Sequence, residues 1–190
     1  MIRVETIDHE TLTKRYVLGG TEILTTPEQI IVNMIGAGYP ITASPTTSYM
    51  YHGLPVNEIG NQKVLEVGVA LSQFMPTYAT GKPQDKPVVV GLEDYSEIRQ
   101  LSKKVQEDPT SSDMVKKIAE LYEARAKIME SNLVVYFQGQ FDSVFPELLR
   151  MQKFDYVIAI DSILLWSAGM YVEYTYKLKE LLSPNGTLIT

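Results

Sequence analysis

The stretch Lys63–Ser72, which reads K-V-L-E-V-G-V-A-L-S, decides the fold. Lys63–Val67 is a short apolar run that stops at Gly68, as expected of a buried strand followed by a turn. A helix is predicted next, over Ser72–Thr80, and Gly81–Pro87 is predicted to be a loop because glycine and proline interrupt regular structure. A strand, a glycine turn and a helix in this order indicate the start of an α/β arrangement.

The same alternation continues along the rest of the chain. Short β-branched or apolar runs predict four more strands, at Val88–Leu92, Leu133–Phe137, Tyr156–Ile160 and from Thr187 onward. Between them, helical faces are predicted at Ile98, Leu101 and Val105, at Met114, Ile118, Leu121 and Ile128, and in a helix over Tyr171–Leu182 that ends at the turn Ser183–Gly186. Strands that alternate with helices predict a doubly wound parallel sheet, which binds ligands at the carboxyl ends of its strands.

Composition excludes several classes of protein. The 190 residues include no cysteine, so neither a disulfide nor a zinc–cysteine site is available. The net charge of −6 opposes binding to a phosphate backbone, and no nucleic-acid partner is expected. The sequence shows neither a secretory leader nor an apolar stretch long enough to cross a membrane. A cytoplasmic protein without a membrane partner is therefore expected.

The first strand contains an acid and is followed by small residues. Glu66 is in the strand, and Gly68, Ala70 and Ser72 alternate through the turn E-V-G-V-A-L-S. Small residues allow a ligand to approach the backbone closely. Two of the three are not glycine, however, so a turn that needs a positive φ would be strained there.

This turn resembles the E-x-G-x-G-x-G loop of the class I S-adenosylmethionine-dependent methyltransferases, with Gly68, Ala70 and Ser72 at the three glycine positions. The rival dinucleotide pattern G-x-G-x-x-G would place Gln73, which is not small, at its third glycine. The resemblance implies that S-adenosylmethionine is the cofactor and that Glu66 and the loop contact it. The alternative is a strand-to-helix turn that binds no ligand.

The resemblance implies further cofactor contacts after the second and third strands. An acid after the second strand accepts hydrogen bonds from both ribose hydroxyls, a role suited to a carboxylate. When the position of this acid is counted forward from Gly91, it falls on Glu93, whereas the resemblance of D-Y-S-E to the family's motif places it on Asp94. The acid that does not bind the ribose would cap the next helix. Gln140 stands where the family has an acid near the adenine amino group, and Asp142 is expected to cap the following helix.

Two later segments also resemble the family. Phe154–Ile160 reads F-D-Y-V-I-A-I, similar to the family's F-D-x-V strand, and Leu182–Ile189 reads L-S-P-N-G-T-L-I, similar to its L-x-P-G-G-x-L-I. The resemblance covers Lys63–Thr190. It implies that Asp161 faces the methyl donor and the substrate, and that Asp155 orients the start of its strand.

The predicted fold is a Rossmann-like sheet of five parallel strands in the order 3-2-1-4-5, without the family's usual strands six and seven. Residues 61–190 would form this domain, and residues 1–60 an N-terminal segment that covers the sheet edge or the cofactor cleft. In that segment we expect strands at Met1–Thr6 and Lys14–Leu18 and a helix capped by Thr26 with Pro27 in its first turn. Pro40–Pro55 is the candidate substrate-side loop.

Taken together, these residues favour an S-adenosylmethionine-dependent methyltransferase that acts on a small molecule or a protein, with Asp161 or His52 as a candidate general base. The alternative is a non-catalytic binding or assembly protein of the same fold. A nicotinamide-dependent oxidoreductase is disfavoured by Gln73 and by the segment after the fourth strand. The sequence does not indicate the methyl acceptor, and an uncovered sheet edge would invite self-association, for example as a homodimer.

Overall fold

The computed structural model describes residues 3–8, 13–18, 21–39, 41, 53–54, 59–71, 74–160 and 168–190. The chain divides into two compact units, and each is made of two separate stretches of sequence. Unit 1 comprises Met1–Ile41 and Tyr95–Lys127, and unit 2 comprises Thr42–Asp94 and Ile128–Thr190. Among the described residues, no helix is both long and apolar enough to span a membrane.

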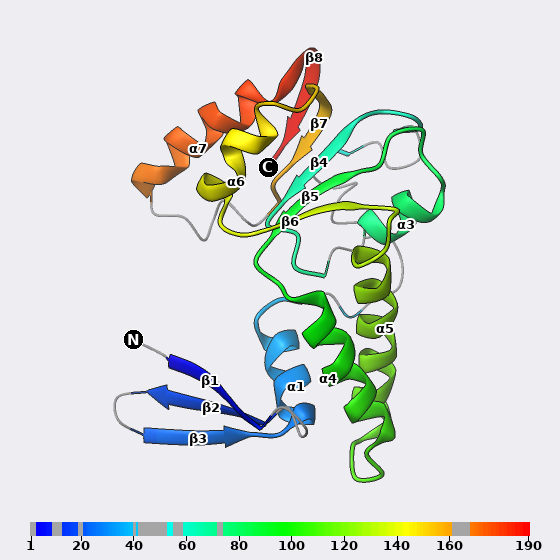
Figure 1. The fold of residues 1–190 in the computed structure, drawn as a ribbon, viewed down its shortest axis with the longest axis vertical. Coiled ribbons are helices and arrows are strands. Elements are labelled where there is room, and N and C mark those ends of the chain that lie inside the picture. The colour runs from blue at the N-terminus through cyan, green and yellow to red at the C-terminus, as the bar shows by residue number, and fades with distance from the viewer. Residues whose placement is uncertain are drawn as a thin grey trace. The chain divides into compact units, whose positions relative to one another are not determined.

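Unit 2 is built on a parallel sheet (Figure 1). Its described strands are β4 (Val64–Val67), β5 (Val88–Gly91), β6 (Val135–Gln138), β7 (Phe154–Ile158) and β8 (Leu182–Ile189). They lie in the order β6-β5-β4-β7-β8, and every neighbouring pair is parallel. This confirms the predicted order 3-2-1-4-5, with the strand of the K-V-L-E-V stretch at the centre.

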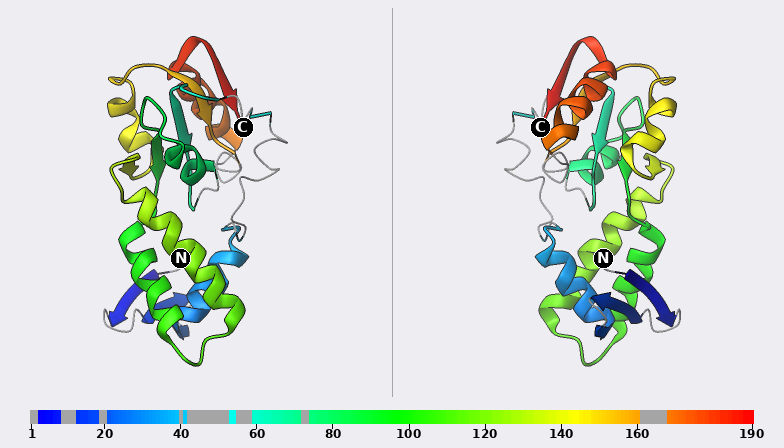
Figure 2. Two further views of the ribbon diagram at one scale, coloured as in Figure 1. Left: turned by 90° about the vertical axis from the view of Figure 1, so that its right-hand side faces the viewer. Right: turned by 90° about the vertical axis from the view of Figure 1, so that its left-hand side faces the viewer.

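Both faces of the central strands are covered, which explains why β4 and β5 are buried along their whole length. Leu65 and Val67 pack on one face, in an apolar cluster with α6 (Phe141–Leu148) and α7 (Ala168–Glu180). Figures 1 and 2 show these two helices next to each other, while α3 (Phe74–Thr80) lies on the other side of the sheet.

The last strand begins earlier than the sequence predicts. The expected turn Ser183–Gly186 lies inside β8, where the pairing with β7 jumps from Phe154–Leu182 to Tyr156–Thr187. The extra residues form a bulge, because Leu182 already pairs before the turn. Gly186 is needed there, since a Cβ at this position would lie 2.8 Å from the carbonyl oxygen of Phe154.

Unit 1 contains an antiparallel sheet in the order β1-β2-β3, in its described residues. Its strands are β1 (Arg3–Asp8), β2 (Thr13–Leu18) and β3 (Thr21–Thr25). The two strands expected here are confirmed, whereas β3 was missed. Leu18 pairs with Thr21, so two residues, Gly19 and Gly20, separate the strands. Two glycines between such runs are a hairpin signal.

The helices of unit 1 are α1 (Pro27–Gly36), α4 (Tyr95–Glu107) and most of α5 (Asp113–Met129), which Figures 1 and 2 show side by side. The cap of α1 is confirmed, because Thr26 Oγ1 accepts a hydrogen bond of 3.3 Å from Gln29 N. The predicted apolar face of α4 is also confirmed, since Ile98, Leu101 and Val105 are buried.

The predicted apolar face of α5 is wrong at its start. Met114 is 69% exposed, and the buried apolar positions are Val115, Ile118, Ala119, Tyr122, Ala126 and Met129. These residues follow the helical spacing i, i+3, i+4, i+7 from Val115. The prediction gave weight to large aliphatic residues and overlooked the two alanines and the tyrosine that complete this stripe.

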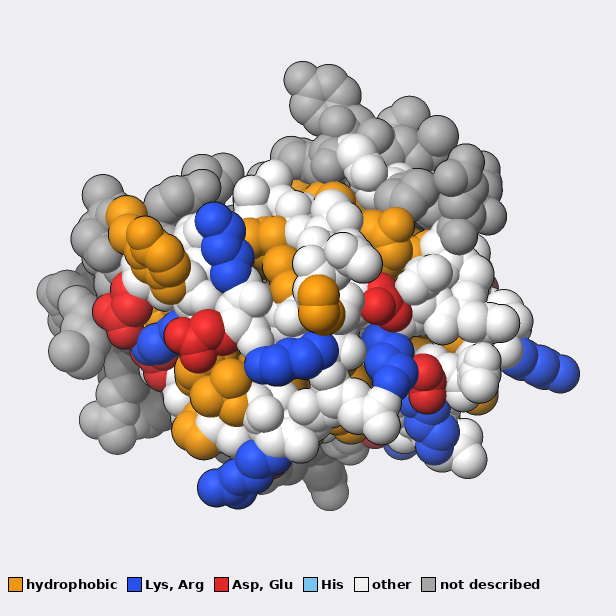
Figure 3. All heavy atoms as spheres, turned by 90° about the horizontal axis from the view of Figure 1, so that it is seen from above, with side chains coloured by type: hydrophobic (Ala, Val, Ile, Leu, Met, Phe, Trp, Pro, Cys, Tyr) orange, Lys and Arg blue, Asp and Glu red, His pale blue; other side chains and the backbone are white. Residues whose placement is uncertain are grey.

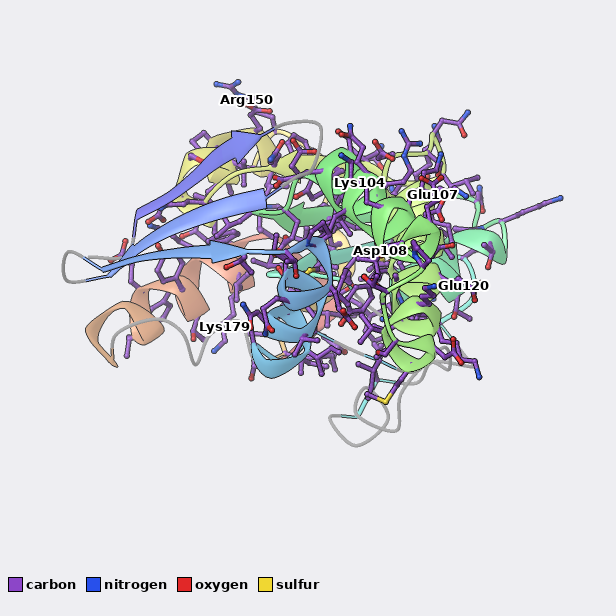
Figure 4. All side chains as sticks on the ribbon, turned by 90° about the horizontal axis from the view of Figure 1, so that it is seen from below. Lys104, Glu107, Asp108, Glu120, Arg150 and Lys179 are labelled. Carbon is purple, nitrogen blue, oxygen red and sulfur yellow. The ribbon has the colours of Figure 1, made fainter. Side chains whose placement is uncertain are left out.

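The two compact units do not divide at residue 60, and the expected domains 1–60 and 61–190 stay a prediction. The crossover from β5 to β6, through α4 and most of α5, groups with the N-terminal stretch. Contacts within unit 1 explain this: α1 packs on α4, Ser112 N donates to Glu28 Oε1 at 3.1 Å, and Tyr122 Oη donates to Tyr39 O at 3.3 Å. Figure 4 labels Lys104, Glu107 and Asp108 around the end of α4 and Glu120 on α5, so both charge signs occur on this helix pair.

Some N-terminal residues nevertheless belong to unit 2. Leu54 and Ile59 are each 2% exposed and form part of its core. The expectation that an N-terminal segment covers the sheet edge or the cofactor cleft stays a prediction. On the face in Figure 3, basic and acidic side chains are interspersed with apolar ones.

Candidate functional site

The candidate site lies at the carboxyl ends of β4, β5 and β6. Hydrogen bonds continue from strand to strand beyond the sheet: Gly68 N donates to Val90 O at 2.9 Å, and Gly139 N donates to Gly91 O at 2.8 Å. The loops that follow the three strands are therefore tied together. The strand order reverses at β4, which is where doubly wound sheets bind their ligands.

The loop after β4 keeps a left-handed backbone at two of the resembling positions. The φ of Gly68 is +73° and that of Ala70 is +43°. Glycine adopts this region freely, whereas an alanine there costs about 1–2 kcal/mol. The strain expected at a non-glycine second position is therefore present at Ala70. Ser72, the third position, lies outside the described residues.

Glu66 is a carboxylate inside the sheet. It is only 4% exposed, and it lies on the face of β4 opposite Leu65 and Val67. Burial of an ionised carboxylate is costly unless polar groups compensate it. Glu66 takes part in an interaction within the chain, so a structural role can account for it as well as a ligand contact can.

The carboxylate of Glu93 lies beside the glycine loop. Its Oε2 accepts a hydrogen bond of 2.9 Å from Leu92 N. A Cβ placed on Gly91 would be 2.6 Å from Glu93 Oε2 and 3.1 Å from Val69 Cγ1, so both side chains border the space above Gly91. Asp94, the other candidate for the ribose, is exposed. The choice between Glu93 and Asp94 stays a prediction.

Gln140 follows β6 and is the N-cap residue of α6. Its carbonyl oxygen accepts from Ser143 N at 3.0 Å and from Ser143 Oγ at 2.6 Å. Its exposed side chain makes no capping hydrogen bond. The amide group is thus not used to cap the helix, and its proximity to an adenine ring stays a prediction.

Asp142 does not cap α6, which corrects the expectation from sequence. It lies in the first turn, after the cap residue, and links α6 to α7. Tyr174 Oη donates to Asp142 Oδ2 at 2.5 Å, and Lys177 Nζ is 2.8 Å from Oδ1. The hydrogen bonds from Lys177 and from Tyr174 lower the pKa of Asp142. The bond to Asp142, with burial, raises the pKa of Tyr174 to about 12.

The two candidate catalytic residues, Asp161 and His52, lie outside the described residues. Their roles stay predictions. The strand that precedes Asp161 in the sequence, β7, ends at Ile158, and Ala159 N still donates to Ile189 O at 2.8 Å. Among the described residues, no group of three or more acidic or histidine side chains could hold a metal ion.

A hollow of about 280 Å³ lies away from these loops, among the residues before β4 and those around the end of α3. It is lined by Ile59, Gly60, Asn61, Phe74, Thr77, Tyr78, Gly81 and Pro83. Burial, followed by the nearby charges of Asp85 and Asp155, raises the pKa of Tyr78 to about 12. None of the residues predicted to bind the cofactor lines this hollow.

Comparisons with known proteins were made for sequence and for structure. No protein-family model matches the chain, and no curated protein matches it. Among solved structures, a SAM-dependent methyltransferase from Thiobacillus denitrificans in complex with S-adenosyl-L-homocysteine is similar, with 12% identity, a TM-score of 0.45 and coverage of 83% of this chain and 53% of that one.

Two further solved structures give similar values. A SAM-dependent methyltransferase from Geobacter sulfurreducens, also in complex with S-adenosyl-L-homocysteine, has 11% identity, a TM-score of 0.46 and coverage of 84% of this chain and 53% of that chain. The CcbJ methyltransferase from Streptomyces caelestis has 18% identity, a TM-score of 0.46 and coverage of 83% and 53%. The chain thus spans about half the length of these proteins. The α/β, Rossmann-like fold of unit 2 rests on its own strand order and pairing.

Proposed function

We propose that this chain is an S-adenosylmethionine-dependent methyltransferase that acts on a small molecule or a protein. The cofactor would bind across the carboxyl ends of β4, β5 and β6. The observation that carries the proposal is the position of the Glu93 carboxylate, which borders the space above Gly91 together with Val69 of the left-handed loop. An acid and a tight loop at the reversal point of a parallel sheet are suited to a ribose and the groups attached to it.

The residues present fit such a ligand. A carboxylate has two oxygens that only accept hydrogen bonds, and a ribose offers two hydroxyl donors. One oxygen of Glu93 already accepts from Leu92 N, which fixes the direction of the group. The buried side chains of Val69 and Leu71 hold the loop on the core, so its backbone conformation is preformed.

The sulfonium of the cofactor supplies an activated methyl group. The task of the chain is then to hold donor and acceptor in line, because correct orientation accounts for much of the rate of such transfers. Glu93 and the loop after β4 would hold the nucleoside part, with Glu66 beneath the loop and Gln140 near the base. Asp161 or His52 stays the candidate to take up the proton of the acceptor.

Calorimetric titration with S-adenosylhomocysteine and with S-adenosylmethionine tests the proposal. We expect dissociation constants in the micromolar range. A constant weaker than about 1 mM, which is only about −4 kcal/mol of binding free energy, contradicts a cofactor role. Binding of both compounds without methyl transfer to any offered acceptor would instead support the non-catalytic alternative.

Two matched variants identify the ribose ligand. Glu93→Gln keeps the size of the side chain but removes its charge, and we expect it to weaken binding about ten- to a hundredfold, because hydrogen bonds to charged groups contribute about 1.5–3 kcal/mol. Asp94→Asn makes the same change one residue further on, where the side chain is exposed, and should alter affinity less than about twofold. The reverse result would transfer the role to Asp94.

A further inference from the structure

A tyrosine on the neighbouring strand holds the peptide that carries Glu93. Tyr136 Oη donates a hydrogen bond of 2.8 Å to Glu93 O, although the two residues are 43 positions apart. Tyr136 lies in β6, opposite Val89 of β5. Val135 and Phe137, its neighbours in β6, pack against the cluster on the other face of the sheet. Tyr136 therefore lies on the face of the sheet that also carries Glu66.

The absence of a side chain at Gly91 leaves space for the Glu93 carboxylate beside Tyr136. A Cβ on Gly91 would be 2.6 Å from Glu93 Oε2, 3.1 Å from Val69 Cγ1 and 3.2 Å from Tyr136 Oη. Groups that follow or belong to β4, β5 and β6 thus share the room left by one missing side chain. A Cβ at 2.6 Å would force the end of the flexible Glu93 side chain to move, so glycine at this position leaves the carboxylate its place.

We propose that Tyr136 is a positioning residue for the nucleoside site. We further propose that the space above Gly91, called the seat below, holds the Glu93 carboxylate. The hydroxyl of Tyr136 fixes the Glu93 peptide, and the open position at Gly91 lets the carboxylate fold back beside the glycine loop. The inference rests on the proposed function for the identity of the ligand. The seat itself is formed by the described side chains.

The test compares Tyr136→Phe with Tyr156→Phe. Tyr156 is a half-buried tyrosine in β7, to which no role in the site is assigned, so its variant controls for the loss of a hydroxyl in the sheet. Calorimetry measures binding of S-adenosylhomocysteine and of its 2′-deoxyribose analogue to each protein. The ratio of the two affinities reports how well the carboxylate meets the ribose.

Tyr136→Phe is expected to weaken binding of S-adenosylhomocysteine about three- to tenfold and to reduce the preference for the ribose over the deoxyribose compound. Tyr156→Phe should leave both affinities within about twofold of the unchanged protein. If Tyr136 only stabilises the sheet, its variant will unfold at a lower temperature but keep the same ratio of affinities. That result would overturn the inference.

Gly91→Ala provides a second variant with an intact Tyr136. Its Cβ should displace the carboxylate and weaken binding as much as Glu93→Gln does, and the double variant should bind no more weakly than either single one. Additive losses would contradict a shared seat.

A measurement without ligand separates this inference from the proposed function. Leu92 N donates to Glu93 Oε2, so hydrogen exchange of the Leu92 amide reports whether the carboxylate is seated. We expect faster exchange in Tyr136→Phe and in Gly91→Ala than in Tyr156→Phe. If the unchanged protein binds no cofactor but the exchange rates follow this order, the proposed function fails and the seat stands. Equal exchange rates in all three variants would refute the seat, whatever binds there.

Discussion

Ala70 has a φ of +43°, in the region that glycine adopts most easily. The sequence predicted this strain, because the resembling loop has glycine where this chain has Ala70. Left-handed non-glycine residues persist where the surrounding structure fixes them, and they are concentrated at ligand sites. The buried neighbours Val69 and Leu71 provide such fixation.

Replacement of Ala70 by glycine should stabilise the folded chain by about 0.5–1 kcal/mol. The strain of about 1–2 kcal/mol is relieved, while the greater freedom of glycine in the unfolded chain offsets part of the gain. We also expect tighter binding of S-adenosylhomocysteine, because the Cβ no longer narrows the loop. Thermal unfolding and calorimetry measure the two effects.

Lys82→Gly is the matched control. Lys82 also has a positive φ, +57°, and lies after α3, outside the loops of the candidate site. This variant should gain similar stability without any change in affinity. A loss of stability in Ala70→Gly would show that the left-handed conformation costs nothing in the folded chain.

Single-residue roles were predictable from sequence only where they depend on neighbours along the chain. The loop residues Gly68 and Ala70 belong to this class. Glu93 could not be distinguished from Asp94, since their distances along the chain differ by one residue. Tyr136 was missed because its contact depends on the register between β5 and β6, which the sequence does not fix. Asp142 was assigned to a local cap, whereas Tyr174, its partner, is 32 residues away.

At the scale of elements, the pairing of Asp142 with Lys177 and Tyr174 joins α6 to α7. The pKa of Asp142 is lowered in the folded chain, so its carboxylate stabilises the fold above the unfolded pKa of about 3.9, and this contribution is lost as the pH falls through the folded pKa. Asp142→Asn should therefore cost about 1 kcal/mol at pH 7, an amount reduced by the partial exposure of the pair.

Urea unfolding at several pH values checks this expectation. The difference between Asp142→Asn and the unchanged protein should shrink as the pH is lowered from 7 toward the acid range. Glu147→Gln, at an exposed position of the same helix, is the control and should change stability little at any pH. If the free energy of unfolding of Asp142→Asn stays below that of the unchanged protein by the same amount at low pH, packing rather than the charge of the carboxylate joins the two helices.

The order and type of the elements in unit 2 were largely predictable, because β-branched runs and breakers specify them locally. The bounds that were wrong depend on distant pairing. Leu182 joins β8 because Phe154 lies opposite it, and no local signal distinguishes such a strand start from the end of a helix. The face of α5 depends on what packs on it, and small residues such as Ala119 give little signal alone.

For the whole molecule, the two units should unfold as separate transitions. Tyr122→Phe removes the hydrogen bond to Tyr39 O in unit 1, and Asp155→Ala removes the acceptor of Lys63 N, at 2.9 Å, and of Ser183 Oγ, at 3.1 Å, in unit 2. Each change should cost about 1–3 kcal/mol. We expect each variant to shift one of two calorimetric transitions and to leave the other in place.

S-adenosylhomocysteine should raise only the transition that Asp155→Ala lowers, because the proposed site lies in unit 2. A single transition, shifted equally by both substitutions, would show that the two units unfold together. The division into units was not predictable from sequence: the crossover through α4 and α5 has the pattern of an ordinary helical connection, and only its contacts with α1 assign it to unit 1.

The central place of β4 has a consequence for synthesis on the ribosome. The strand is made early, with β5 soon after it, but its other neighbour, β7, is translated only after the whole of α4 and α5. During that interval one side of an apolar strand has no partner, and unpaired strand edges attract other chains. The time taken to translate residues 92–153, between the end of β5 and the start of β7, therefore sets how long the nascent chain carries this exposed edge.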